Sequence, residues 1–214
     1  MGIETNLQWV AIGQAIISQV KSGMVGRLAD LQDGTLKMLL AMAQSGNGDH
    51  LEIGTLFGGS AIAAALMKKE LGLDGNVVCL DPLDGFYIGT PIEAPNDPVT
   101  KLSINLTTLV ENIGRFEVLD RLEIIVRRSY PWPVELEKRS FASAYIDGDH
   151  WNNIPWLDWL NVKDRVSHFV IFDNYDLEHS DVMTACQQAE QDRNWRRVHS
   201  EGITFILERV NDLE

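Results

Sequence analysis

Residues 51–60 read Leu51-Glu52-Ile53-Gly54-Thr55-Leu56-Phe57-Gly58-Gly59-Ser60. The segment begins as a short apolar strand, and an alanine-rich stretch over 61–71 predicts a helix directly after it. Glycine in the turn between them lets the backbone pass close to a ligand, because a side chain there would collide with it. The free N–H groups at the start of the helix can receive an electron-rich group. We therefore expect a ligand-binding turn at the carboxyl end of a strand, where open α/β sheets bind their ligands.

The spacing of this turn indicates the kind of ligand. The order Glu52-x-Gly54-x-x-x-Gly58-Gly59-Ser60 differs from the Gly-x-Gly-x-x-Gly pattern of dinucleotide sites and has an acid before the first glycine. A carboxylate repels a pyrophosphate, whereas it attracts a cofactor with an amino or sulfonium cation. The turn thus favours S-adenosylmethionine (SAM) over a nicotinamide dinucleotide. The alternative is an ordinary connection between a strand and a helix.

Composition limits the class of protein. The chain has 214 residues, of which 45% are hydrophobic, and this suffices for one domain over residues 1–214. With 18 basic and 31 acidic residues the net charge is −13, which argues against nucleic-acid or membrane partners. Two cysteines, Cys79 and Cys186, make no disulfide framework. No segment approaches the ~20 apolar residues of a membrane span, and the first residues lack the basic-then-apolar pattern of a signal peptide, so we expect neither. We expect a cytoplasmic protein.

Apolar runs and helical spacing alternate along the chain. Strands are expected to end at residue 53 and to span 77–80, 122–126, 142–146 and 168–172. Helices are expected at 61–71, 102–113, 151–160 and 182–190. Residues 195–199 and 203–207 predict a closing hairpin that adds one antiparallel strand at the edge. This alternation predicts an α/β fold with a mostly parallel sheet and helices on both faces.

Two segments stand apart from this alternation. Residues 1–35 predict an N-terminal helical extension, and a second helix begins after Asp33. The extension would cover a sheet edge, cap the site or pair with another subunit as a homodimer. Residues 82–100 hold four of the seven prolines, and such a long irregular stretch is typical of a functional loop. We expect this loop to contact the substrate.

Acidic residues lie at the ends of the predicted strands. Glu52 lies in the first strand, while Asp81, Asp147 and Asp173 follow the second, fourth and fifth. The carboxyl ends of parallel strands meet at one edge, so these four carboxylates should surround one crevice. Asp81 follows the neighbouring strand, where its two oxygens could accept both hydroxyls of a ribose. The alternative for Asp81 is a role in a turn or at a helix N-terminus.

A second group of oxygen donors suits a metal ion. Asp147, Asp173 and Asn174 offer two carboxylates and an amide carbonyl, which Mg²⁺ prefers. The nearby Asp149, His150 and His179 keep Mn²⁺ or Fe²⁺ open as alternatives. These residues would otherwise be only a turn and a helix cap.

The order of these motifs resembles class I SAM-dependent methyltransferases. The matching stretches are 52–55 with 58–60, then Asp81, 128–129, 145–150 and 172–175, and the closing hairpin resembles the reversed seventh strand of that fold. Within the class the chain looks most like metal-dependent O-methyltransferases of the catechol and caffeoyl-CoA type and like macrocin-type sugar O-methyltransferases. The resemblance implies a Rossmann-like, mostly parallel seven-stranded sheet with an antiparallel C-terminal hairpin.

The resemblance also implies roles for residues. The cofactor SAM would be held by Glu52, Gly54, Thr55, Gly58, Ser60, Asp81, Ser129 and Asp147, with Asp81 on the ribose and Ser129 beside the adenine. The metal ligands would be Asp147, Asp173 and Asn174. Catechol-type enzymes have a catalytic Lys three residues after the first metal ligand, but this chain has His150 there. Either His150 or Asp149 is therefore expected to accept the proton.

We thus expect a SAM-dependent methyltransferase that methylates a hydroxyl of a small molecule with the help of a divalent ion. One alternative is a metal-independent methyltransferase, whose activity would survive a chelator. Another is a domain of this fold that binds without catalysing a reaction. An NAD-dependent oxidoreductase is a weaker alternative, because the glycine spacing and the closing hairpin count against it.

Overall fold

A computed structural model describes residues 6–28, 33–87 and 93–210. The expected N-terminal extension (1–35) and the expected loop (82–100) are therefore described only in part. None of the helices in the described ranges is long and apolar enough to cross a membrane.

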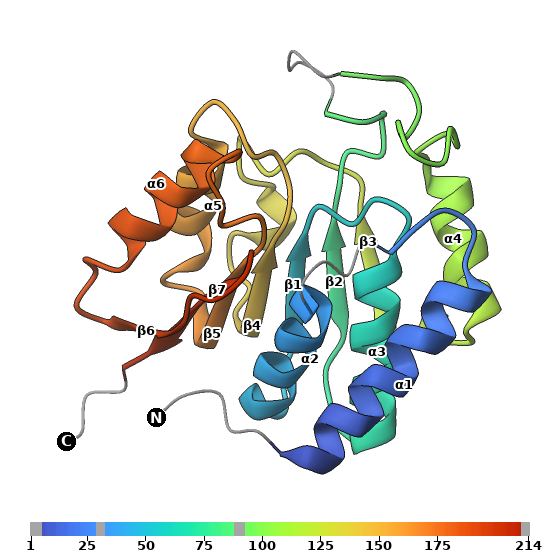
Figure 1. Cartoon of the computed structure of the whole chain (residues 1–214), viewed down its shortest axis with the longest axis horizontal. Helices are drawn as coiled ribbons and strands as arrows, with labels where there is room; N and C mark the ends of the chain where they lie inside the picture. Colours follow the sequence, from blue (N-terminus) through green and yellow to red (C-terminus); the bar gives the residue numbers. More distant parts are fainter. Residues whose placement is uncertain (1–5, 29–32, 88–92, 211–214) are drawn as a thin grey trace.

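One seven-stranded sheet forms the centre of the molecule (Figure 1). Its strands are β1 (His50–Ile53), β2 (Val77–Leu80), β3 (Leu122–Ile125), β4 (Phe141–Ile146), β5 (Val166–Phe172), β6 (Trp195–His199) and β7 (Phe205–Arg209). The order across the sheet is β3-β2-β1-β4-β5-β7-β6, and β1 to β5 are parallel. The strand order changes direction between β1 and β4, and α/β sheets bind ligands outside the carboxyl ends at such a point.

The closing hairpin is present, but its antiparallel strand is not at the edge as expected. β7 pairs antiparallel with β5 on one side and with β6 on the other, so β6 is the edge strand. The burial of the two strands explains this order. Phe205, Ile206 and Leu207 are completely buried, whereas Arg196 and Arg197 of β6 are exposed. The more apolar strand takes the inner position, where it is covered on both faces.

Helices cover both faces of the sheet, as expected (Figure 1). α1 (Leu7–Gly23), α2 (Gly34–Ser45) and α3 (Gly59–Leu71) pack on one face, and α4 (Leu106–Arg115) joins the same apolar core. α5 (Ile154–Val162) and α6 (Ser180–Ala189) pack on the other face. Alternate residues of β2 enter the two cores: Cys79 lies in the first and Val78 in the second. Both cysteines are buried and free.

Two helices begin later than the sequence pattern predicts. α4 begins at Leu106 because the side chain of Asn105 accepts a hydrogen bond from the Thr108 N–H and so fixes the N-terminus. α5 begins at Ile154, with Pro155 in its first turn, where a missing N–H is tolerated. Each shift moves residues into the preceding loop, and both loops reach the site described next.

Candidate functional site

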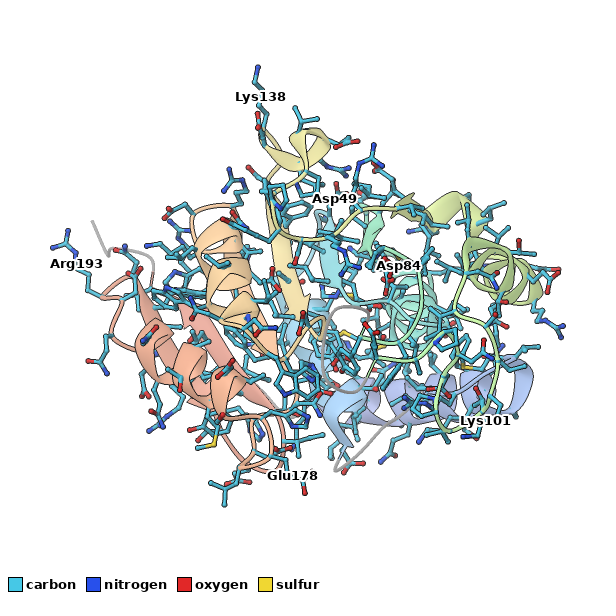
Figure 2. All side chains as sticks on the ribbon, turned by 90° about the horizontal axis from the view of Figure 1, so that it is seen from above. Asp49, Asp84, Lys101, Lys138, Glu178 and Arg193 are labelled. Carbon is cyan, nitrogen blue, oxygen red and sulfur yellow. The ribbon has the colours of Figure 1, made fainter. Side chains whose placement is uncertain are left out.

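A cavity of about 580 Å³ opens at the carboxyl edge of the parallel strands. Its walls come from the turn after β1, the segment after β2, the ends of β4 and β5, and the segment between α1 and α2. Figure 2 looks onto this edge of the molecule, with Asp84 near the centre and Glu178 near the rim. The position agrees with the crevice predicted from the acidic strand ends.

Gly54 allows the turn after β1 to pass close to the end of β4. Its φ is +88°, and a Cβ there would lie 2.1 Å from the carbonyl oxygen of Asp147. Glycine is therefore required here by the neighbouring strand, in addition to the expected need of a ligand. Gly58 has a φ of +86° and begins α3 in a left-handed conformation. Thr55 and Ser60 of this turn both line the cavity.

Asp81 fixes the shape of the same turn. Its Oδ2 accepts hydrogen bonds from the N–H groups of Thr55 at 2.7 Å and Leu56 at 2.9 Å, and its Oδ1 accepts one from Leu83 at 2.7 Å. Asp81 is almost completely buried, and burial raises the pKa of its carboxyl group. The residue lines the cavity as predicted, but three backbone donors already occupy its oxygens. About one acceptor position remains for a ligand hydroxyl.

Glu52, which was predicted to bind the cofactor, does not line the cavity and lies behind Ser60, which does. Glu52 is completely buried, and its Oε1 accepts a hydrogen bond from the Ser60 hydroxyl at 3.1 Å. Its Oε2 has no hydrogen-bond partner within the described part of the chain. Burial raises the pKa of the Glu52 carboxyl group well above its usual value. The hydrogen bond from the Ser60 hydroxyl partly opposes this rise. A bound cation would satisfy the free oxygen.

The segment after β3 forms the opposite wall. Arg128, Ser129 and Tyr130 all line the cavity, and the role of Ser129 beside an adenine stays a prediction. The guanidinium of Arg128 lies 2.7 Å from Oδ2 of Asp84, across the cavity mouth. Both side chains are about half exposed, so this ion pair is expected to contribute little to stability.

Asp147, Asp173 and Asn174 lie together at the ends of β4 and β5. One terminal atom of the Asn174 amide is 3.1 Å from Oδ2 of Asp173 and 3.3 Å from Oδ1 of Asp147. If that atom is nitrogen, the amide donates to both carboxylates. If it is oxygen, three oxygens face one another and a cation between them would offset the repulsion.

The two carboxyl groups of this cluster are hard to ionise. Burial raises the pKa of Asp147 to about 7. Burial, followed by the charge of Asp147, raises that of Asp173 to about 8. Oδ1 of Asp173 is buried and has no partner among the described residues. In the same residues no group of three or more His, Cys, Asp or Glu side chains is placed to hold a metal ion. The ligand set expected from the sequence is not such a group, because its third member is the amide of Asn174. Its oxygen donors fit a hard ion such as Mg²⁺.

The two residues predicted as bases are placed differently. His150 is 4% exposed; its Nδ1 lies 3.1 Å from the Tyr87 hydroxyl and its Nε2 lies 3.4 Å from Oδ1 of Asp147. Burial lowers the pKa of His150 to about 4. Asp149 does line the cavity, and its Oδ1 accepts a hydrogen bond from the Trp151 N–H at 3.0 Å.

The segment 82–100 contributes directly to the cavity, within its described part. Phe86 and Tyr87 line the wall, and the Tyr87 ring makes an edge contact with Trp151 at 4.8 Å between centroids. The segment is anchored by Asp97, which forms an ion pair with Arg27 at 2.9 Å. Arg27 lies between α1 and α2 and also lines the cavity.

Two contributors to the site, Arg27 and Asp97, were missed in the sequence, and a third, His179, was given a different role. Arg27 and Asp97 pair across 70 positions of sequence, so no local pattern connects them. His179 also lines the cavity, and the sequence suggested it only as an alternative metal ligand. Asp176 and His179 are three positions apart in the sequence, and this spacing could have predicted that the carboxylate orients the imidazole.

Solved structures with the same architecture were found, whereas no protein-family model and no curated protein matches the sequence. The O-methyltransferase NovP has a TM-score of 0.70 at 13% identity, with 97% of this chain and 100% of that chain covered. Cofactor-bound Rv0187 from MTB has a TM-score of 0.60 at 21% identity, with 95% and 89% covered. The O-methyltransferase TomG from Streptomyces achromogenes, in complex with SAM, has a TM-score of 0.59 at 15% identity, with 97% and 99% covered. The chain therefore has the Rossmann-like fold of class I methyltransferases, as the motif resemblance implied.

Proposed function

We propose that this chain is a SAM-dependent methyltransferase that methylates a hydroxyl group of a small molecule with the help of a divalent ion. One observation carries the proposal: a single cavity joins the glycine turn and Asp81 to the Asp147, Asp173 and Asn174 cluster. The names of the structural neighbours support it, since NovP and TomG are O-methyltransferases. TomG is in complex with SAM, and an O-methyltransferase from Bacillus cereus is in complex with SAH.

The cofactor would lie along the turn after β1. The hydroxyl of Ser60, with the Glu52 carboxyl group behind it, suits the amino group of its methionine part. The remaining acceptor position of Asp81 suits one ribose hydroxyl, and Ser129 lies on the wall expected to face the adenine. The ends of β4 and β5 line the remainder of the same cavity, where the acceptor would bind.

The residues of β4 and β5 would hold the metal ion and orient the acceptor. Asp147, Asp173 and Asn174 would bind the ion, which when present lowers the pKa of a hydroxyl bound to it. Phe86, Tyr87 and Trp151 would wall the acceptor and exclude water from the reacting atoms. Methyl transfer needs the acceptor oxygen in line with the carbon–sulfur bond, so most of the rate gain would come from this alignment.

Calorimetric titration of SAM, with and without Mg²⁺, tests the proposal. We expect binding by the wild type in the micromolar range and at least tenfold weaker binding by Asp81→Ala. Asp164→Asn is the matched control, because Asp164 is an exposed acid outside the cavity wall. A wild type that binds no SAM under either condition would contradict the methyltransferase proposal and favour a non-catalytic binding module.

A metal-independent methyltransferase is the second candidate. The orientation of Asn174 in which its amide donates to both carboxylates favours it, because that orientation needs no cation. The two candidates differ in one measurement. Methyl transfer that persists in excess EDTA would favour the second, and loss of transfer that Mg²⁺ restores would favour the first.

The partners and location remain predictions. We propose a small-molecule acceptor, because aromatic side chains line part of the cavity and the described residues offer no extended groove of basic side chains. The net charge of −13 supports the absence of nucleic-acid and membrane partners. A homodimer through the N-terminal helices and a cytoplasmic location stay open to experiment.

A further inference from the structure

The imidazole exposed in the cavity belongs to His179. Its side chain is 18% exposed and lines the cavity wall at the start of α6. His150, in contrast, is nearly completely buried, with one ring nitrogen against the Tyr87 hydroxyl and the other facing Asp147. An acceptor in the cavity would therefore meet His179 before it met His150.

Asp176 holds the ring of His179 in one orientation. Its Oδ1 lies 2.9 Å from Nδ1 of His179 and also accepts hydrogen bonds from the N–H groups of Glu178 at 2.9 Å and His179 at 3.1 Å. Because the carboxylate only accepts, Nδ1 must carry the proton in this contact. The neutral ring then has its lone pair on Nε2, on the side away from Asp176.

Two aromatic neighbours complete the setting of this ring. The His179 ring makes an edge contact with the His150 ring at 4.9 Å between centroids and with the Trp151 ring at 5.8 Å. Trp151 lines the same cavity and contacts Tyr87, so these rings form one aromatic group around the acceptor end. An oriented base within an aromatic wall is the arrangement expected for proton transfer.

We propose that His179, oriented by Asp176, accepts the proton of the acceptor hydroxyl. The proposal rests on the methyltransferase function proposed above. The acceptor oxygen forms a bond to the methyl carbon while the bond between that carbon and sulfur breaks. The electron pair of the broken bond stays on sulfur, and the hydroxyl proton moves to Nε2 of His179. The sulfonium charge thereby ends on an imidazolium paired with Asp176, so atoms and charge balance.

Charged groups of both signs surround this ring. The acids are Asp176 and Glu178 on its own segment, Asp149 after β4, and the Asp147 and Asp173 pair, while the basic groups are His150 against the ring and Arg27 and Arg128 elsewhere on the cavity wall. The imidazolium formed by proton transfer would lie against the Asp176 carboxylate, whose Oδ1 is 2.9 Å from Nδ1 of His179. His150 then acts as a positioning residue, because it holds Tyr87 in the wall.

Variants of the two histidines test the proposal. SAM binding is first measured by calorimetry, and methyl transfer to catechol and to methyl α-glucoside is then measured with Mg²⁺ between pH 6 and 10. His179→Gln should keep SAM affinity within about threefold and lose about 100-fold in kcat. The loss should shrink at high pH, where the acceptor ionises without a base. Asp176→Asn should lose less, and Asp176→Glu should restore part of it.

His150→Gln is the matched comparison. It should change KM for the acceptor more than kcat. If His179→Gln retains wild-type kcat and pH profile while His150→Gln loses kcat about 100-fold, the proposal is overturned.

An NMR measurement decides the proposal without an acceptor. Long-range ¹H–¹⁵N correlation at pH 8 should show the His179 proton on Nδ1 and none on Nε2. A proton on Nε2 would overturn the role of His179 whatever the wild type does with SAM. Failure of the proposed function has a different signature, namely a wild type that binds no SAM and whose His179 still carries its proton on Nδ1.

Discussion

The carboxylate of Asp81 holds the backbone of Thr55, since Oδ2 of Asp81 accepts a hydrogen bond from the Thr55 N–H at 2.7 Å. The same oxygen bonds Leu56, and the other oxygen bonds Leu83. Leu56 and Leu83 both have a φ of +51°, a left-handed conformation that is unfavourable for leucine. The acid at the end of β2 therefore maintains the unusual backbone of the turn after β1 and of its own loop.

Asp81→Asn is expected to weaken both the fold and the cofactor site. An amide has one acceptor oxygen, so at least one of the three N–H groups would face an NH₂ group. Buried unpaired donors cost about 1–3 kcal/mol each, so we expect the free energy of unfolding to fall by about 2 kcal/mol. Urea denaturation and SAM calorimetry measure the two effects. Unchanged stability, equal to that of Asp164→Asn, would show that the turn does not depend on Asp81.

Gly54→Ala is expected to be among the most damaging single changes in the chain. The new Cβ would lie 2.1 Å from the Asp147 carbonyl oxygen, and the φ of +88° is unfavourable for alanine. β1 and β4 would have to separate, so we expect a loss of more than about 3 kcal/mol or no folded protein. Gly72→Ala is the control, because Gly72 has a φ of +64° with nothing within 4 Å of its Cβ position. That variant should lose only about 1 kcal/mol in thermal or urea unfolding.

The sequence predicted the elements that depend on local pattern. Apolar runs that contain Glu52 or are followed by Asp81, Asp147 and Asp173 identified four strands and the edge at which they meet. It did not predict that β7 lies inside β6, because that order depends on which strand is better buried between neighbours from distant parts of the chain. The resemblance to methyltransferases supplied the fold, which the structural neighbours confirm.

The details of the site were less predictable for a similar reason. Whether His150 or His179 faces the cavity depends on how the loops after β4 and β5 fold against each other. Tyr87 takes one nitrogen of His150, and Tyr87 belongs to the segment whose conformation had no sequence pattern. Residue types could therefore be assigned from sequence, while their orientation depended on contacts between distant segments.

The pH dependence of stability should reveal the Asp147 and Asp173 pair. Burial raises their pKa values to about 7 and about 8, whereas an unfolded aspartate has a pKa of about 3.9. These two groups thus bind more protons in the folded chain than in the unfolded chain between about pH 4 and 8. The free energy of unfolding should fall as pH rises through this window, by at most ~1.4 kcal/mol per pH unit for each group.

Urea unfolding in EDTA at pH 5, 6, 7 and 8 measures this slope. Asp173→Asn should flatten it, because the amide does not titrate. Mg²⁺ should offset the loss of stability at pH 8, if it binds the ionised pair. A wild type whose stability rises between pH 6 and 8 in EDTA would contradict the prediction.

The ion pair between Arg27 and Asp97 should hold the 82–100 segment against the N-terminal segment. The Asp97 side chain is completely buried and that of Arg27 is 26% exposed, and Oδ2 of Asp97 also accepts two hydrogen bonds from Thr100 at 2.7 Å. Arg27→Met would leave a buried carboxylate without its partner, so we expect a loss of about 2 kcal/mol and faster proteolysis between residues 82 and 100. The exposed pair of Arg128 and Asp84 gives the control: Arg128→Met should change stability by less than about 1 kcal/mol. Equal effects of the two variants on unfolding and on proteolysis would show that the Arg27 contact does not anchor the cavity wall.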